Sequence, residues 1–118
     1  RRIVCRMRED GFVAPLRAIS SKEASKLRCK LDEYQRSMEG GLSGNARFKT
    51  HLLLPWVANL VENTAILDAV EQCIGKDILV WSSGWAIKPP HSDGFYSWHQ
   101  DSTYAGLEPT DSVVVAWI

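Results

Sequence analysis

The stretch Ile78-Leu79-Val80-Trp81-Ser82-Ser83-Gly84-Trp85-Ala86-Ile87-Lys88 decides the expected fold. Its first four residues form a continuous apolar run, which is typical of a β-strand covered on both faces. The run resumes at Trp85, and Pro89-Pro90 ends it, because proline cannot donate a hydrogen bond within a sheet. We therefore expect residues 78–88 to form strand structure at the centre of the fold.

The residues before this stretch predict helices. Ser20 and Glu23 form a capping-box pattern. Apolar residues then recur at helical spacing until Gly40-Gly41, at positions Ala24, Leu27, Leu31, Tyr34 and Met38. Pro55 suits the first turn of a short helix that runs from Trp56 to Val61. Asn63 or Thr64 can cap another helix, which Gly75 ends.

The residues after it predict more β-structure. We expect residues 97–103 to be extended, residues 107–110 to form a turn and residues 112–118 to form a final strand. Helices followed by strands without intervening helices indicate an α+β or mainly β fold. We expect a partial jelly roll, a double-stranded β-helix with flanking N-terminal helices. The chain begins with Arg1-Arg2 and ends within an apolar run, so we expect residues 1–118 to be the N-terminal part of one truncated domain.

Composition narrows the function classes. Fourteen basic and fourteen acidic residues give zero formal net charge, and the basic residues are scattered, which disfavours a nucleic-acid surface. No apolar run is long enough to span a membrane. The three cysteines, Cys5, Cys29 and Cys73, form no paired motif, so a reducing compartment, cytoplasmic or otherwise intracellular, is expected. The expected partner is a small-molecule substrate, and oligomeric state is open.

The chemistry centres on His99-Gln100-Asp101. On a strand, residues i and i+2 point to the same face, so the imidazole and the carboxylate would project side by side. Two histidines and one carboxylate form the facial triad of non-haem iron(II) oxygenases. The motif is short, and taken alone it is better explained by an exposed strand with a histidine and an aspartate on one side.

The surrounding residues make the pattern specific. Lys88-Pro89-Pro90 precedes Ser97-Trp98-His99-Gln100-Asp101, and Tyr104, Leu107-Glu108-Pro109, Asp111 and Ala116-Trp117 follow in order. This ordered series resembles the phytanoyl-CoA dioxygenase family of Fe(II)- and 2-oxoglutarate-dependent oxygenases. Asp10-Gly11-Phe12-Val13 and the helical run up to Gly75 fit the N-terminal part of that family, so the resemblance covers most of the chain from residue 9.

The resemblance implies a jelly-roll fold and a metal site in which His99 and Asp101 bind iron(II). It implies that 2-oxoglutarate and dioxygen are cosubstrates. In the family, a distal histidine and an arginine that binds 2-oxoglutarate lie further along than this chain extends. Four other positions have a structural interpretation as well as a functional one. Trp117 lines the cosubstrate pocket or fills the core, and His51 reaches the cosubstrate or is structural. Lys88 faces substrate or solvates a strand end, and Tyr104 borders the active-site mouth or has a structural role in the core or at the rim.

The resulting function is a dioxygenase that hydroxylates an unactivated C–H bond of a small organic substrate, although residues 1–118 alone are expected to be inactive. Asp101 favours hydroxylation, because related halogenases carry glycine or alanine there and leave room for a halide. Two alternatives remain. One is a cupin-like or zinc site built from His91, His99 and Asp101. The other is an inactive member that keeps the fold without the chemistry.

Overall fold

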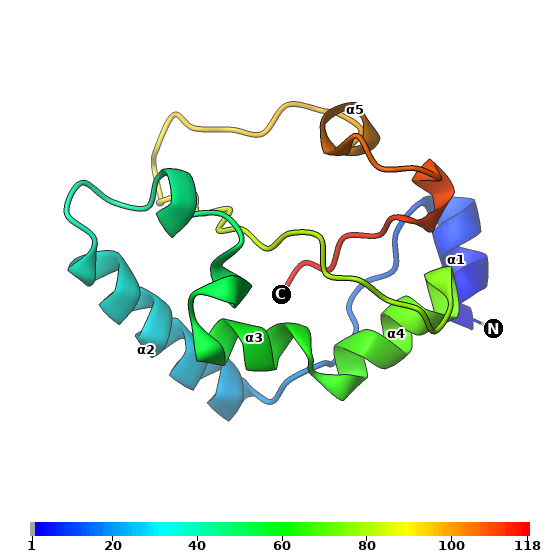
Figure 1. The fold of residues 1–118 in the computed structure, drawn as a ribbon, viewed down its shortest axis with the longest axis horizontal. Coiled ribbons are helices and arrows are strands. Elements are labelled where there is room, and N and C mark those ends of the chain that lie inside the picture. The colour runs from blue at the N-terminus through cyan, green and yellow to red at the C-terminus, as the bar shows by residue number, and fades with distance from the viewer. Residues whose placement is uncertain (1) are drawn as a thin grey trace.

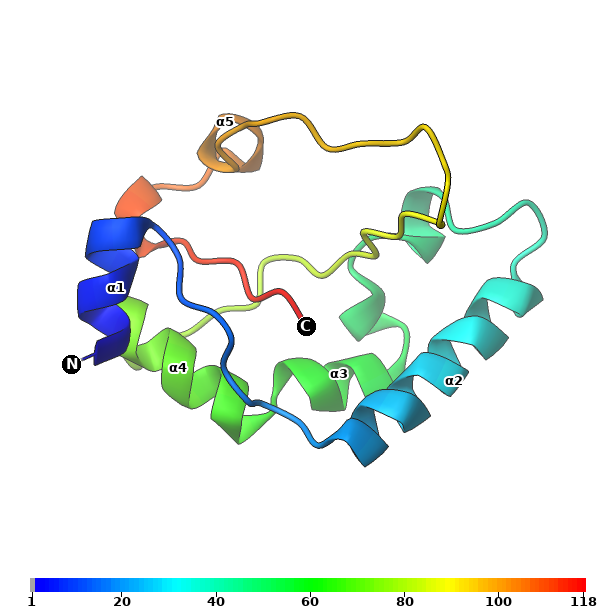
Figure 2. The same ribbon diagram turned by 180° about the vertical axis from the view of Figure 1, so that it is seen from behind.

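The computed structural model describes residues 2–118, and within them it is a helical structure with long extended connections (Figure 1). Five α-helices occur in the described residues, at α1 Arg2–Asp10, α2 Ser21–Ser37, α3 Pro55–Val61, α4 Thr64–Ile74 and α5 Ser102–Ala105. Three 3-10 turns add η1 Gly44–Ala46, η2 Thr50–Leu52 and η3 Thr110–Ser112. Helices α1 and α2 lie toward opposite ends of the molecule in both views (Figures 1 and 2).

Helix α2 begins as the sequence predicts. The Ser20 hydroxyl accepts a hydrogen bond from the Glu23 backbone N–H over 3.2 Å, and the Ser20 backbone N–H donates to the Glu23 carboxylate over 2.9 Å. These two bonds satisfy donors that have no partner within the helix, which fixes its first turn. The predicted capping box is therefore confirmed.

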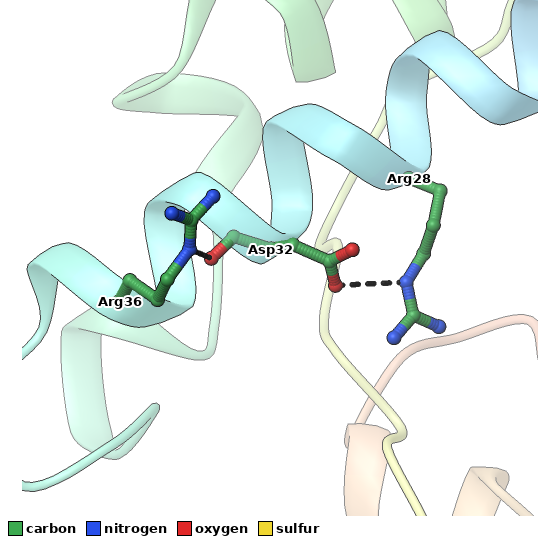
Figure 3. A network of polar contacts seen from close by, with 3 residues as sticks. All are labelled: Arg28, Asp32 and Arg36. Atoms are coloured by element: carbon green, nitrogen blue, oxygen red, sulfur yellow. Dashed lines mark hydrogen bonds and ion pairs between the residues drawn. The ribbon is translucent and has the colours of Figure 1, made fainter.

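The outer face of α2 carries a short polar chain (Figure 3). The Arg28 Nε atom lies 2.8 Å from Asp32 Oδ1, and Arg36 Nε donates to the Asp32 backbone oxygen over 3.1 Å. Asp32 is one helical turn from Arg28 and one from Arg36, which places all three side chains on one face. At its C-terminal end α2 is tied to η1, because the Tyr34 hydroxyl donates to the Ala46 carbonyl oxygen over 3.1 Å.

Helices α3 and α4 also follow local signals. Pro55 stands at the first turn of α3, where its missing N–H costs no helical hydrogen bond. The Asn63 side chain caps α4 by accepting from the backbone N–H groups of Ala65 and Ile66. Gly75, with φ of +89°, ends α4 in a conformation that other residues rarely adopt. Both predicted helices are confirmed, and Asn63 rather than Thr64 is the cap.

Helix α1 was not predicted. Ile3, Val4 and Met7 are half-buried on it at spacings that place them on one side, and α1 packs against α4. The turn η3 also packs against α4, so these three elements gather at one end of the molecule (Figure 2). The segment after η3 then runs back toward the middle of the structure (Figures 1 and 2).

The expected jelly roll is wrong for the described residues. They contain no β-sheet, and the single bridge joins Phe48 to Gly84. Residues 78–88 and 112–118 are largely extended but pair with no neighbouring strand. A β-rich sequence favours an extended backbone, whereas a sheet also needs a second strand in register to take its hydrogen bonds. Residues 97–103 are also not one extended segment, because α5 begins at Ser102.

The burial expected for these segments is absent as well. Leu79 is 80% exposed, although residues 78–81 were expected to be covered on both faces, and Trp98 before His99 is fully exposed. Only Val57, Ile66 and Thr50 are buried within residues 2–118. The accessible surface is 9631 Å², whereas a compact monomer of 13.3 kDa exposes about 6,500 Å². The arrangement is therefore open, with apolar side chains along its connections.

Two further features bear on the expected environment. Within residues 2–118, no helix is both long and apolar enough to cross a membrane. Cys5, Cys29 and Cys73 are free thiols, and Cys73 alone is half-buried.

Candidate metal centre

His99 and Asp101 face each other at the entry to α5. The His99 Nε2 atom lies 3.0 Å from Asp101 Oδ1, and the two side chains are 35% and 55% exposed. Asp101 has helical backbone angles, φ −61° and ψ −31°, and its carbonyl oxygen accepts from the N–H groups of Tyr104 and Ala105. The start of a helical turn, rather than the alternation of a strand, therefore brings the two groups together.

The Ser97 backbone fixes the orientation of the imidazole. His99 Nδ1 lies 2.7 Å from the Ser97 carbonyl oxygen. A carbonyl oxygen only accepts, so Nδ1 carries the proton, and Nε2 faces Asp101. In metal-binding histidines the non-ligating ring nitrogen donates in the same way to a backbone carbonyl or carboxylate. The sequence motif gave no sign of this partner, although Ser97 is only two residues away.

Charge around the ring favours a cation. The Ser97 carbonyl is the largest cause that raises the pKa of His99 above its ordinary value of 6.5, and the Asp101 carboxylate adds to it against the effect of desolvation. With the proton on Nδ1, the neutral ring directs the Nε2 lone pair at Asp101 Oδ1, and two lone pairs repel each other. The contact becomes favourable when a proton or a metal ion lies between these two atoms. The same arrangement that attracts a proton is suited to a metal ion.

The spacing of the two atoms also fits a shared ion. Ligand atoms about 2.1 Å from a metal on neighbouring octahedral positions lie about 3.0 Å from each other. His99 Nε2 and Asp101 Oδ1 have this separation. One imidazole and one carboxylate are also the donor types that the iron(II) facial triad uses. The residues present therefore fit two positions of such a site.

A third protein ligand is not assembled in the described part of the chain. No group of three histidine, cysteine, aspartate or glutamate side chains is placed to hold a metal there. The cupin-like alternative needed His91 beside His99 and Asp101, and the described structure does not bring these three together. His91 is instead exposed in the preceding loop, with φ of +59°.

Of the other predicted site residues, Tyr104 comes next to the pair. Its ring meets the His99 imidazole edge-on, with ring centroids 5.7 Å apart and planes at 80°. Tyr104 itself is 76% exposed, so it lies at the rim of the pair rather than in a core. Its place beside His99 is compatible with a role in bordering substrate.

The remaining predicted residues are not brought to this pair. Trp117 is 78% exposed, so it fills no core in the described structure. Lys88 is exposed. His51 is half-buried at η2, where its Nδ1 atom lies 2.7 Å from Ser83 Oγ. In both views α5 stands well apart from α3 and the turns before it (Figures 1 and 2).

Sequence reasoning missed the residue that orders the approach to this pair. Arg47 donates from Nε to the Trp85 carbonyl oxygen over 3.0 Å and from Nη2 to the Tyr96 hydroxyl over 2.8 Å. It thereby connects the segment before η2 with the loop that leads into Ser97. A single arginine between Ala46 and Phe48 carries no local signal for contacts 38 and 49 residues away.

Comparison with known families identifies the chain. The phytanoyl-CoA dioxygenase (PhyH) family matches residues 7–118. The chain belongs to the phytanoyl-CoA dioxygenase family. This family lies within the Fe(II)- and 2-oxoglutarate-dependent oxygenases, and its members generally use both cofactors. No curated protein and no solved structure matches the chain significantly.

Proposed function

We propose that this phytanoyl-CoA dioxygenase family chain binds iron(II) through His99 Nε2 and Asp101 Oδ1 and serves a 2-oxoglutarate-dependent hydroxylation. The substrate class is a small organic molecule with an unactivated C–H bond. The observation that carries the proposal is the 3.0 Å approach of the two side chains, with Nδ1 of the imidazole held by the Ser97 carbonyl. Neither group needs to turn before both face the same ion.

Each residue has a distinct task in this proposal. His99 offers the Nε2 lone pair, and Ser97 keeps the other ring nitrogen protonated. Asp101 supplies a negative charge that offsets part of the metal charge, and its carboxylate occupies the position that a halide would need, which favours hydroxylation. Tyr104 covers one side of the imidazole. Iron held by His99 and Asp101 would supply the activation of dioxygen that no side chain here can supply.

Lys88 and Tyr104 remain candidates for substrate contact. Their exposure leaves both accessible to a ligand. We also propose that residues 1–118 form part of one oxygenase domain, because the family match is continuous from residue 7 to residue 118.

Metal binding by the chain tests the proposal directly. Iron(II) is titrated anaerobically into the 118-residue chain and into His99→Ala and Asp101→Ala variants, and calorimetry measures the dissociation constant. We expect saturable binding to the parent chain and its loss in both variants. Gln100→Ala is the matched control, since Gln100 stands between His99 and Asp101 in the sequence, is exposed and is not a proposed ligand. Equal affinity in His99→Ala and the parent chain would remove the site.

Activity is a separate readout. In a protein that contains this chain and converts 2-oxoglutarate, succinate formation is measured with and without each substitution. His99→Ala and Asp101→Ala should abolish it, whereas His91→Ala should leave it unchanged, because the described structure does not bring His91 together with His99 and Asp101. Succinate formation at the parent rate in Asp101→Ala would contradict the proposed role of the carboxylate.

A further inference from the structure

Positive charge is concentrated near the N-terminus of this neutral chain. Residues 1–17 contain five arginines and two acidic residues, a formal charge of +3, whereas residues 18–118 contain nine basic and twelve acidic residues, a formal charge of −3. Because the whole chain has no net charge, attraction to an anionic partner must come from a local surface. Arginine suits phosphate in particular, since its planar guanidinium can donate two parallel hydrogen bonds.

Two of these arginines line a groove between α1 and the segment that follows it. Arg2 and Arg6 are one helical turn apart, so they lie on the same face of α1. The groove has a volume of about 220 Å³, and its lining consists of Arg2, Ile3 and Arg6 from α1 and Val13, Pro15 and Leu16 from the following segment. Two cations and an apolar wall therefore meet in one groove.

Neither arginine is strongly paired within the described residues. Arg2 forms no ion pair there, and Arg6 Nε lies 3.6 Å from Asp10 Oδ2. The Arg6 and Asp10 side chains are 38% and 48% exposed. A long and exposed pair of this kind contributes little, so an anionic ligand can take the place of Asp10. Both guanidinium groups are therefore available for an anion.

Exposed apolar side chains accompany the two arginines. Phe12 is 59% exposed and Leu16 is 46% exposed, and both belong to the segment that leaves α1 (Figure 2). The apolar residues of α1 itself are not available, because they are half-buried where α1 packs against α4. Basic side chains beside an exposed phenylalanine and leucine are typical of a surface that lies at the headgroup boundary of a membrane. A soluble phosphate would use the arginines but leave Phe12 and Leu16 in water.

We propose that Arg2, Arg6, Phe12 and Leu16 form an N-terminal patch that docks the protein on an anionic phospholipid membrane. The arginines bind the headgroup phosphates, and the two apolar side chains enter the boundary between headgroups and acyl chains. The chain rests on the membrane surface in this arrangement, and no described helix is long and apolar enough to cross it. The patch contains neither His99 nor Asp101, so docking does not depend on the proposed iron site.

Cosedimentation of the 118-residue chain with vesicles tests docking. Binding is compared on phosphatidylcholine vesicles and on vesicles of equal parts phosphatidylcholine and phosphatidylserine. We expect saturable binding to the mixed vesicles, little binding to phosphatidylcholine alone, and release as the salt concentration rises. Arg2→Gln and Arg6→Gln should each raise the lipid concentration at half-binding about fivefold, the usual contribution of one basic residue near an anionic surface. Phe12→Ser should weaken binding without reducing its dependence on salt, because it removes an apolar contact and no charge.

Two matched variants lie outside the patch and should bind like the parent chain. Arg28→Gln removes one arginine from α2, which lies toward the opposite end of the molecule from α1 (Figures 1 and 2), and Phe95→Ser removes another exposed phenylalanine. Equal binding to phosphatidylcholine alone, or an effect of Arg28→Gln as large as that of Arg6→Gln, would overturn the proposal. Release by inorganic phosphate at constant ionic strength would overturn it in favour of a free phosphate site. Equally tight binding to polyglutamate would overturn it in favour of an acidic protein partner.

Discussion

The Tyr104 ring and the His99 imidazole form a T-shaped pair, with centroids 5.7 Å apart and an interplanar angle of 80°. Aromatic pairs in this arrangement contribute about 0.5–1.5 kcal/mol beyond the area they bury. Both side chains are accessible, so the lower part of that range applies. The contact limits the motion of a ring that must keep Nε2 beside Asp101.

Replacing Tyr104 by alanine should therefore weaken iron(II) binding about threefold, because the imidazole loses a neighbour that restrains it. Tyr104→Phe should bind like the parent chain, since it keeps the ring and removes a hydroxyl without a described hydrogen bond. Anaerobic calorimetry gives the dissociation constants. If Tyr104→Phe weakens binding as much as Tyr104→Ala, the hydroxyl and not the ring contact is the important group.

Arg47 provides a second prediction, this time on stability. Arg47→Met keeps much of the aliphatic stem but removes the hydrogen bonds to the Trp85 carbonyl and the Tyr96 hydroxyl. We expect the free energy of unfolding to fall by about 1–2 kcal/mol, the net value of two such bonds. Urea denaturation measures the loss. Tyr96→Phe should cost roughly half as much, because it removes one bond of the two.

Hydrogen exchange locates the effect of Arg47→Met. Amide protons in residues 85–98 should exchange faster, because Arg47 holds this loop to the segment before η2. Exchange in α2 should be unchanged. A uniform increase over the whole chain would show that Arg47 stabilises the fold generally and does not order the approach to Ser97.

The capping box of α2 gives a pH dependence with a defined sign. The Ser20 backbone N–H is the main cause that lowers the pKa of Glu23 below its ordinary value of 4.5, and the Ser20 hydroxyl adds to it. A carboxyl whose pKa is lower in the folded state stabilises the fold above its unfolded pKa. That contribution is lost as the pH falls from about 4.5 through the lower folded pKa.

Circular dichroism should therefore show loss of helix as the pH falls below about 4.5. In Glu23→Gln this contribution to the acid dependence should be absent, because glutamine at this position keeps the reciprocal hydrogen bond without a titrating group. Ser20→Ala should lower stability by about 1 kcal/mol at neutral pH. An acid transition identical in Glu23→Gln and the parent chain would assign the dependence to other carboxylates.

Local signals in the sequence predicted the helices well. Ser20 and Asn63 cap α2 and α4, Pro55 opens α3 and Gly75 closes α4, and each acts through neighbours within four residues. The strand predictions were wrong because the pairing of a strand depends on a partner that is distant in sequence. Residues 78–88 have the composition of a strand, but in the described structure their β-pairing is limited to one bridge, between Gly84 and Phe48.

The sequence predicted that His99 and Asp101 lie side by side, but it predicted this from strand geometry. His99 and Asp101 do converge, yet a turn into α5 brings them together where strand alternation was expected. The contacts of Ser97 and Ser83 with histidine rings were missed, because serine is common and the contact depends on backbone geometry. Tyr104 lies beside His99 because the chain turns back on itself in α5. In an extended segment these two residues would lie far apart.

The small core permits a sharp comparison between two apolar residues. Ile66 on α4 is buried, whereas Leu79 in the expected strand is 80% exposed. Ile66→Ala should lower the free energy of unfolding by about 2–3 kcal/mol, through lost transfer energy and a residual cavity. Leu79→Ala should change it by less than about 0.5 kcal/mol, as for an ordinary surface position. Urea denaturation of both variants gives the two values. A loss in Leu79→Ala as large as that in Ile66→Ala would mean that Leu79 is buried after all, and the helical arrangement of residues 2–118 would then need revision.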